Sequence, residues 1–170
     1  GRTHQCGTIQ LDMNLPERFD VSYTDEHNNK VRPVMIHRVI YGSFERFIGI
    51  LIEHFAGKFP LWLSPVQVKI INVADRHKDY CEEVREKFER EGFRVETNYS
   101  HETVSNKIRL AREQDKPNYM LILGDKDVEK KTISVRTRKI VDDKNEEFTT
   151  TIDEFLPKIV KERDNKEIKD

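Results

Sequence analysis

Cysteine is scarce in this sequence. The two cysteines, Cys6 and Cys81, stand far apart in the chain and form no CxxC or comparable metal-binding spacing. A disulfide framework needs several closely placed cysteines, so the small disulfide-rich secreted folds are excluded. Two separated thiols are typical of a reducing compartment, and we expect a cytoplasmic protein.

An excess of one charge sign is also missing. Lys and Arg number 30 and Asp and Glu number 31, which gives a formal net charge of -1. A uniformly basic surface that would attract any nucleic acid is therefore excluded. If the chain binds a polyanion, it must do so through a local patch.

Long hydrophobic runs do not occur. Every apolar stretch is far shorter than the roughly 18 residues that a membrane span needs, and the first residues, GRTHQCGTIQ, lack the charged and then apolar plan of a signal peptide. We therefore expect no membrane partner. The chain starts with glycine rather than methionine and enters a strand-like pattern within ten residues, so we expect a C-terminal fragment of a larger protein.

The first third of the chain contains short strand patterns and one clear helix pattern. Loose alternation over 5–13 and the apolar run PVMIH over 33–37 predict strands, with a proline turn and an asparagine-rich loop between them. From residue 43, apolar side chains recur at helical spacing up to Phe55, and Gly57 and Pro60 mark the end of the predicted helix. The proline-containing segment KFPLWLSPVQ follows, and we place a domain boundary between residues 63 and 64.

After this boundary, strand and helix patterns alternate regularly. The predicted strands are 68–71, 93–97, 119–123 and 132–138, and the predicted helices are 77–92, 102–115 and 152–161. Helices of this length between strands favour right-handed crossovers. We therefore expect an α/β domain with a mixed, mostly parallel sheet flanked by helices on both faces.

One histidine stands out by its position. His37 ends an apolar strand pattern, and GSFER follows at 42–46. A single histidine there is more often a hydrogen-bonded structural residue than a metal ligand, because one ligand does not make a site. However, Ser43 and Arg46 fall on the first turn of the predicted helix, where an arginine pairs with phosphate or stacks on a base. A structural role and a binding role for His37 therefore both stay open on this evidence.

Two long blocks carry a recognisable pattern, GRTHQCGTIQLDMNLPERFDVSY over 1–23 and RPVMIHRVIYGSFERFIGILIEHFAGKFPLWLSPVQV over 32–68. The second resembles the third signature motif of class II aminoacyl-tRNA synthetases with its following helix. The first resembles the segment after the second motif in the threonyl-tRNA synthetases of that class. The resemblance implies that residues 1–63 are the C-terminal part of an antiparallel class II catalytic domain and that residues 64–170 are an anticodon-binding domain.

The resemblance also implies an activity, which is ATP-dependent activation of threonine and its transfer to tRNA(Thr) by a whole enzyme that uses Mg-ATP and dimerises through its catalytic domain. His37 matches a zinc ligand, in a site whose metal holds the amino group and hydroxyl of threonine. The other two protein ligands of that site lie upstream of Gly1, so the zinc site is expected to be incomplete here. Arg46 matches the third-motif arginine, which steadies ATP and neutralises charge during catalysis.

Further matches complete the implied active site. Gln5, Thr8 and Ser43 match residues that hold ATP or the adenylate together with Arg46, and Gln10 matches a residue on the threonine side. The arginine of the second motif and the whole first motif are absent from this sequence. The chain alone is therefore expected to be inactive.

In the resembled family, the anticodon bases are splayed out and read at the edge of the sheet of the C-terminal domain. The stretches HETVSNKIR, NYMLILGDKDV and TISVRTR match that domain. The match implies four base readers, Glu102, Arg109, Asp127 and Arg136, and three phosphate contacts, Lys107, Arg138 and Lys139. Two positions depart from the pattern, since His101 replaces an asparagine of bacterial relatives and Asp127 replaces a longer glutamate. Each of these residues is otherwise an ordinary solvated side chain of a helix or strand.

Three other functions fit the sequence less well. A non-catalytic tRNA-binding or regulatory protein could have kept this domain and lost the chemistry, but it would not need His37 or Arg46. A small-ligand-binding α/β protein would be expected to carry the phosphate fingerprint GxGxxG, which does not occur. A different synthetase of the same subclass would lack the strand histidine and the GTIQLD tract.

Overall fold

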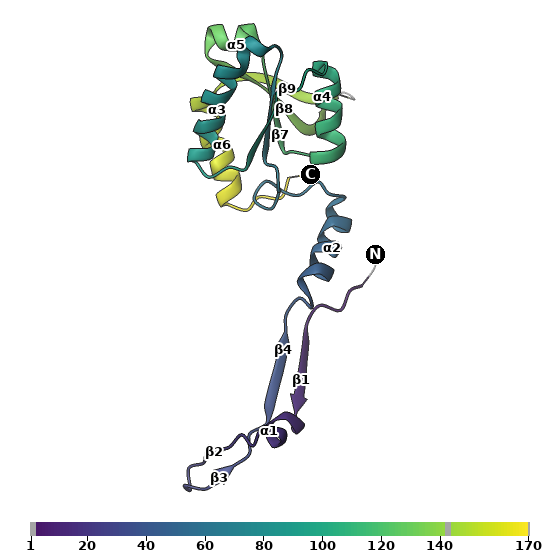
Figure 1. Ribbon diagram of the computed structural model, residues 1–170, viewed down its shortest axis with the longest axis vertical. Helices are drawn as coiled ribbons and strands as arrows, with labels where there is room; N and C mark the ends of the chain where they lie inside the picture. The colour runs from purple at the N-terminus through teal and green to yellow at the C-terminus, as the bar shows by residue number, and fades with distance from the viewer. Residues whose placement is uncertain (1–2, 142–143, 170) are drawn as a thin grey trace. The chain divides into compact units, whose positions relative to one another are not determined.

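The computed structural model describes residues 3–141 and 144–169. They fall into two compact units, a first unit that runs to His54 and a second unit that starts at Phe55 (Figure 1). None of the described helices is long and apolar enough to cross a membrane.

The first unit consists of short strands and two helices. Their order is β1 (Thr8–Asp12), α1 (Asn14–Arg18), β2 (Tyr23–Thr24), β3 (Lys30–Val31), β4 (Met35–Val39) and α2 (Phe44–Phe55). β1 pairs with β4, and β2 pairs with β3, both antiparallel. The strand over 33–37 and the helix from residue 43 were predicted from the sequence. The predicted proline turn instead contains α1, which begins where Asp12 Oδ1 accepts hydrogen bonds from the amides of Asn14 and Leu15 at 2.8 and 3.0 Å.

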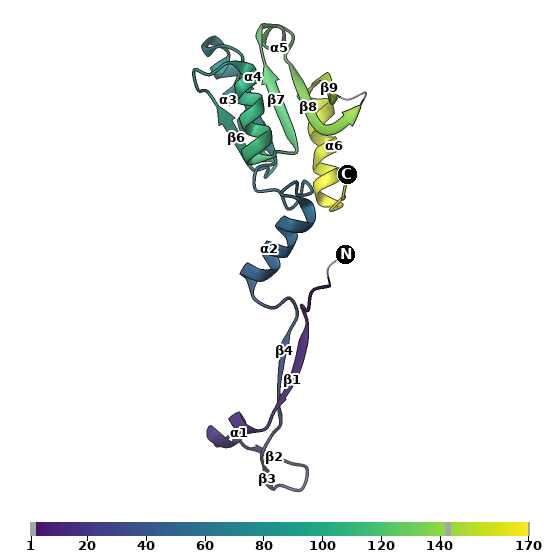
Figure 2. The same ribbon diagram turned by 90° about the vertical axis from the view of Figure 1, so that its right-hand side faces the viewer.

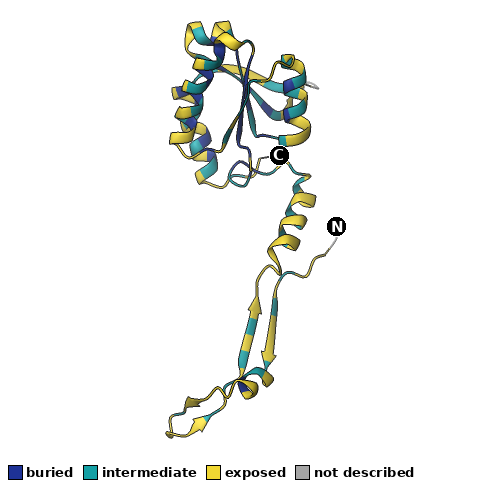
Figure 3. Ribbon diagram, in the orientation of Figure 1, coloured by how far each residue is buried: buried dark blue, intermediate teal, exposed yellow. Residues whose placement is uncertain are grey.

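Apolar side chains of the first unit are largely exposed (Figure 3). On β1, Ile9 and Leu11 are 72% and 66% exposed, and Ile36 on β4 is 63% exposed. Two paired strands have no further layer on which to bury a face, and an isolated pair of this kind is marginally stable in water. The apolar side chains of β1 and β4 would be buried by a further layer of structure, and the described residues of the first unit do not supply that layer.

The second unit is an α/β domain. Its elements are β5 (Val68–Asn72), a 3-10 turn (Asp75–His77), α3 (Lys78–Arg90), β6 (Val95–Asn98), α4 (Val104–Leu110), a π-helical turn (Ala111–Asp115), β7 (Tyr119–Leu123), α5 (Asp125–Lys130), β8 (Thr132–Val141), β9 (Lys144–Thr151) and α6 (Ile152–Asp164). The strands form one sheet in the order β6-β5-β7-β8-β9. In Figures 1 and 2, α3 and α6 cover one face of the sheet and α4 covers the other.

The predicted mixed sheet flanked by helices is confirmed, but parallel pairing is confined to β6, β5 and β7. β8 and β9 pair antiparallel. The reason is the length of the connections, because a parallel crossover needs about a dozen residues or more. α5 is shorter than that, and β8 and β9 follow each other directly in a hairpin. Neither α5 nor β9 is among the elements predicted from the sequence.

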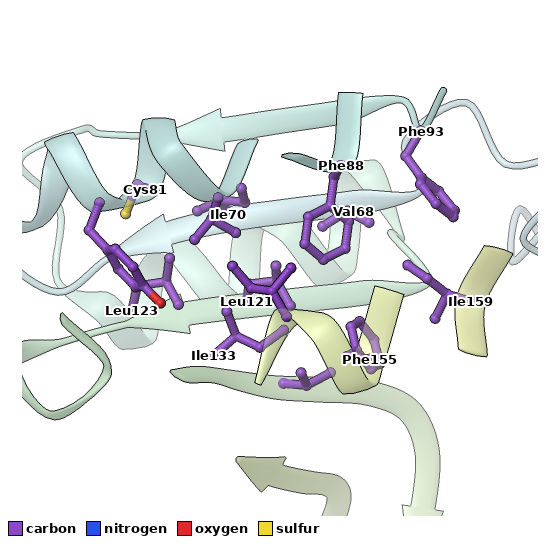
Figure 4. Close-up of a cluster of buried hydrophobic side chains, with 14 of the residues drawn as sticks. Val68, Ile70, Cys81, Phe88, Phe93, Leu121, Leu123, Ile133, Phe155 and Ile159 are labelled. Carbon is purple, nitrogen blue, oxygen red and sulfur yellow. The ribbon is translucent and has the colours of Figure 1, made fainter. Parts of the chain in front are cut away.

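The core of the second unit lies between the sheet and the layer formed by α3 and α6 (Figure 4). Phe88 of α3 and Phe155 of α6 pack with their ring centroids 6.3 Å apart, over strand residues such as Leu121, which is fully buried. Burial of one such side chain stabilises a fold by about 1.5–3 kcal/mol.

Cys81 also lies in this core, and burial raises the pKa of its thiol to about 12. It is therefore a small core residue and not a reactive thiol.

Residues 55–63 pack with the second unit. Leu61 is buried and its carbonyl accepts a hydrogen bond of 2.7 Å from Gln67 Nε2. The carbonyl of Phe59 accepts from Arg138 Nη1 at 2.7 Å and from Asn118 Nδ2 at 3.1 Å. The compact units thus divide before this segment, whereas the domain boundary predicted between residues 63 and 64 stays a prediction.

Candidate functional site

Three of the predicted active-site residues share one face of the β1–β4 pair. In the register of these strands, Gln10 lies opposite His37 and Thr8 lies opposite Val39. Directly opposed side chains of an antiparallel pair point to the same side, and residues two apart on a strand do so as well. Thr8, Gln10 and His37 therefore lie together. Gln5 precedes β1 and is exposed.

A hydrogen bond fixes the ring of His37. Its Nε2 lies 2.9 Å from Oδ2 of Asp12, which is also on this face. The backbone amide of Leu15, and then His37, hold the pKa of the Asp12 carboxyl below its usual value. His37 is thus hydrogen-bonded within the chain, and its role as a metal ligand stays a prediction.

The donor set around His37 does not make a zinc site in this chain. A protein zinc site needs at least three protein ligands. Among the described residues, no group of three or more His, Cys, Asp or Glu side chains could hold a metal ion. His37 supplies one donor, with Asp12 as its hydrogen-bond partner, and the remaining ligands would have to come from elsewhere.

Ser43 and Arg46 meet at the start of α2. The Ser43 hydroxyl accepts a hydrogen bond of 3.3 Å from the amide of Arg46, so Ser43 acts as the helix cap. Arg46 is exposed, and in the described part of the chain its guanidinium has no hydrogen-bond or ion-pair partner. It is available to an anion at this helix end.

In the second unit, a row of polar side chains joins two of the predicted base readers. Glu102 accepts a hydrogen bond from Asn106, and the Asn106 carbonyl oxygen accepts from Arg109 Nη2 at 2.9 Å. Arg109 Nη1 in turn donates to Glu113 at 2.7 Å. Asn106, Arg109 and Glu113 are three or four apart on α4 and the π-helical turn, so they lie along one side of it, and Glu102 joins them from just before the helix. Glu102 and Arg109 therefore belong to one network.

Arg109 and Arg136 line the same cavity, which has a volume of about 600 Å³. Its walls come from α4, the π-helical turn, β8 and β9, with Met120 of β7 and residues of the segment after α2. Cations predominate in the lining, namely Lys58, Arg109, Arg112, Lys116, Arg136 and Arg138, against the single carboxylate of Glu113. Apolar surface from Ile108 and Pro117 lies among them. A cavity of this size with apolar walls and positive groups suits a flat ring that carries anionic substituents.

Arg136 has capacity for another hydrogen bond. It forms an ion pair with Glu147 across the β8–β9 pairing. Its Nε is buried and, within the described ranges, meets no acceptor. Because buried donors normally find an acceptor, a bound ligand is a natural partner for this group.

Asp127, by contrast, turns inward. It is buried at the start of α5, where its carboxylate accepts hydrogen bonds from Gly124 N, Thr132 Oγ1 and Ser134 Oγ at 3.1, 3.3 and 2.9 Å. The carboxylate is therefore satisfied within the protein. Asp127 does not line the cavity of Arg109 and Arg136, and its role as a base reader stays a prediction.

Two of the three predicted phosphate contacts are also engaged internally. Lys107 is buried, and its Nζ donates to the side-chain and backbone oxygens of Asn72 at 2.8 and 3.3 Å. Arg138 donates to the carbonyls of Pro117, Phe59 and Lys116. Burial lowers the pKa of Arg138 to about 10, so it stays charged at neutral pH. Lys139 is exposed and lies 3.6 Å from Glu146.

The sequence reading missed three cations of the cavity, Lys58, Arg112 and Lys116. A signal for Arg112 exists, because it follows Arg109 at i+3, the spacing of neighbours on one helical side. Lys116 lies beyond the helical turns with a left-handed backbone, so helical spacing does not place it. Lys58 gives no such signal. It belongs to the segment after α2 and reaches the cavity through tertiary packing alone.

Comparisons with known proteins show which family the chain resembles. A family model of the tRNA synthetase class II core domain (G, H, P, S and T) matches residues 1–55, and an anticodon binding domain model matches residues 67–162. The threonine–tRNA ligase of Carboxydothermus hydrogenoformans is 52% identical over 163 residues, which are 96% of this chain and 26% of that protein. The threonine–tRNA ligase of Clostridium novyi is 58% identical over 139 residues, which are 82% of this chain and 22% of that protein.

Solved structures give the same picture. The RNA binding domain of threonyl-tRNA synthetase from Cryptosporidium parvum has a TM-score of 0.75 and 38% identity, over 94% of this chain and 40% of that chain. A prolyl-tRNA synthetase from Cryptosporidium parvum, complexed with L-proline and AMP, has a TM-score of 0.71 and 27% identity, over 95% of this chain and 36% of that chain. The chain spans about a quarter of the length of the curated relatives it matches. It belongs to the threonyl-tRNA synthetase family of class II aminoacyl-tRNA synthetases and carries a part of their core domain and their anticodon-binding domain.

Proposed function

We propose that this chain supplies anticodon recognition and part of the active site to an enzyme that activates threonine with ATP and transfers it to tRNA(Thr). The second unit reads the anticodon, and the first unit contributes Arg46 and the Thr8, Gln10 and His37 face to the catalytic domain. The observation that carries the proposal is the cavity in which Arg109 and Arg136 converge.

The cavity can perform base reading in a simple way. An arginine presents two parallel N–H groups that match the acceptor edge of a base, and its flat guanidinium stacks on a base face. Arg109 is half exposed beside Glu113 and can turn toward a ligand. Arg136 is held by Glu147 and offers its unpaired Nε. Together they provide one adaptable and one fixed donor group.

The active-site part acts through positioning and charge. Arg46, exposed at the start of α2, would neutralise negative charge on Mg-ATP as the threonine carboxylate attacks the α-phosphorus. Ser43 caps that helix and so sets the direction of its first turn. Gln10 and Thr8 would line the substrate side of the β1–β4 face, and Gln5 would reach the adenylate from the chain before β1.

We propose that zinc binds only in the whole enzyme. His37 would be one ligand, oriented by its hydrogen bond to Asp12, and the remaining ligands would come from the rest of the catalytic domain. When bound there, zinc would distinguish the hydroxyl of threonine from a methyl group. Dimerisation through the catalytic domain and a cytoplasmic location are likewise proposed for the whole enzyme.

The test is binding of the chain to a fluorescent anticodon stem-loop of tRNA(Thr) at fixed salt, since affinity for RNA depends on salt. Stem-loops with substituted anticodon bases and a non-cognate stem-loop provide the comparison. We expect selective binding that Arg109→Met and Arg136→Met each weaken by about 1–3 kcal/mol. Lys158→Met, which removes an exposed charge from α6 on the opposite face of the sheet, is the matched control. Equal binding of all stem-loops, or no binding, would contradict the proposal.

A further inference from the structure

We propose that Lys58, Arg112 and Lys116 form a phosphodiester-binding subsite at the rim of the cavity, beside the base-reading pair Arg109 and Arg136. This inference rests on the proposed function and extends it. The subsite would take the backbone of the single-stranded RNA whose base occupies the cavity, and it would be indifferent to the identity of that base.

The first argument is charge. Arg109 and Arg136 are each paired with a carboxylate, Glu113 and Glu147. Lys58 and Arg112 are both exposed, and the side chain of neither has a hydrogen-bond or ion-pair partner among the residues that the structure describes. The positive charge of the rim is therefore not neutralised by the protein. A phosphate group supplies the missing negative charge and the acceptors.

The second argument is that the rim is held in place. On the N-terminal side of Lys58, the carbonyl of Ala56 accepts a hydrogen bond of 3.0 Å from Lys116 Nζ. On the other side, the Phe59 carbonyl is held by Arg138 Nη1 at 2.7 Å and by Asn118 Nδ2 at 3.1 Å. The backbone that carries Lys58 is thus tied to the second unit before and after this residue. Arg138 is a positioning residue of the subsite rather than a direct phosphate contact.

Gly57 lies in close contact with the side chain of Lys116. Its φ is +74°, a conformation that favours glycine. A Cβ at this position would also lie 3.1 Å from Nζ of Lys116. A side chain here would therefore strain the backbone and displace a cation of the rim. The segment after α2 is shaped to pass next to Lys116 and to present Lys58.

The test compares the salt dependence of stem-loop binding in the full chain and its variants. Each phosphate contact with single-stranded RNA contributes about 0.7 to the slope of log K against log salt. We expect Lys58→Met and Arg112→Met each to reduce that slope by about 0.7 and to weaken all anticodon sequences equally. Arg112→Lys, which keeps the charge, should restore the slope. Lys158→Met, which removes a lysine from the opposite side of the sheet, should leave it unchanged.

The outcomes separate this inference from the proposed function. If the wild-type chain discriminates anticodon bases but Lys58→Met and Arg112→Met keep the full slope, the subsite is wrong while anticodon reading stands. If the wild-type chain shows no base discrimination, the proposed function fails first, and a slope that is still reduced in these variants supports the subsite by itself. Displacement of the stem-loop by inorganic phosphate at constant ionic strength would assign the subsite to small anions and overturn the phosphodiester reading.

Discussion

His77 and Asp125 are joined by a hydrogen bond of 2.9 Å between Nε2 and Oδ1, although they are far apart in the chain. The other ring nitrogen, Nδ1, accepts from the amide of Ala74 at 3.1 Å, so Nε2 carries the proton and donates to Asp125. Asp125 also accepts two hydrogen bonds from Arg76, at 2.8 and 2.6 Å. This cluster ties the turn before α3 to the start of α5.

The Asp125 cluster predicts a pH dependence of stability. Arg76, and then His77, hold the pKa of the Asp125 carboxyl well below its ordinary value of 3.8. A carboxyl whose pKa is lower in the folded state stabilises the fold above its ordinary pKa, and this contribution is lost as the pH falls below that value. The difference in unfolding free energy between wild type and Asp125→Asn should therefore shrink between about pH 5 and about pH 2.

Urea unfolding across this pH range measures the difference. Glu129→Gln, which removes an exposed carboxylate from the same helix α5, controls for the loss of one negative charge. A difference for Asp125→Asn that stays constant down to the lowest pH would contradict the predicted role of the cluster.

Asp127→Asn is expected to lower stability without changing anticodon preference. Its carboxylate accepts from three donors, and an asparagine would turn an N–H group toward one of them. A buried donor that loses its acceptor costs about 1–3 kcal/mol. Chemical unfolding and stem-loop binding, measured on the same variant and on the exposed control Asp153→Asn, separate the two effects. Unchanged stability with altered base preference would instead support the family-derived role of Asp127 as a base reader.

The first unit is predicted to be far less protected than the second. Ile9, Leu11 and Ile36 are exposed on two paired strands, and such a pair is marginally stable without a further layer. Hydrogen exchange followed by mass spectrometry should show fast exchange in β1 and β4 and slow exchange in β5 and β7. Slow exchange throughout the first unit would show that it has a core of its own.

The same exposed surface predicts self-association of the chain. Large exposed apolar patches mark interaction or aggregation surfaces. Sedimentation velocity should therefore show a mass that rises with concentration, and a double substitution of Ile9 and Leu11 to Ser should reduce that rise. A monomer at all accessible concentrations would contradict this prediction.

Zinc uptake by the chain is expected to be weak. His37 supplies one donor, whereas a zinc site needs at least three protein ligands, and no group of three candidate ligands occurs among the described residues. Zinc measured by elemental analysis after dialysis against a mild chelator should be far below one equivalent. One retained equivalent that is lost in His37→Ala would show that the chain completes the site by itself.

Local pattern was sufficient for several elements. The fully apolar run YMLIL predicts β7 with the bounds that the structure has, Tyr119–Leu123, and the helical repeat from residue 43 predicts α2. The motif blocks were sufficient to predict the family, because short runs such as PVMIH and GSFER contain the residues by which the family is recognised. By contrast, α5 and β9 lack a clear period, since charged residues dominate α5 and polar residues, charged or uncharged, dominate β9. Their structure depends on neighbours along the sheet.

The sequence by itself determined the order of most strands and helices and the family, because these depend on residues close together in the chain. The register that sets Gln10 opposite His37 joins two strands far apart in the chain, and the tertiary structure decided it. The tertiary structure decided the use of individual polar side chains. Asp127 and Arg138 stand in motifs that suggest contact with RNA, but packing turns Asp127 toward three internal donors and Arg138 toward three carbonyls. Packing also brings Lys58 from the segment after α2 to the cavity of Arg109 and Arg136. A buried polar group must form its hydrogen bonds with the partners that the fold places beside it. Those partners come from other parts of the chain, so the local sequence does not reveal them.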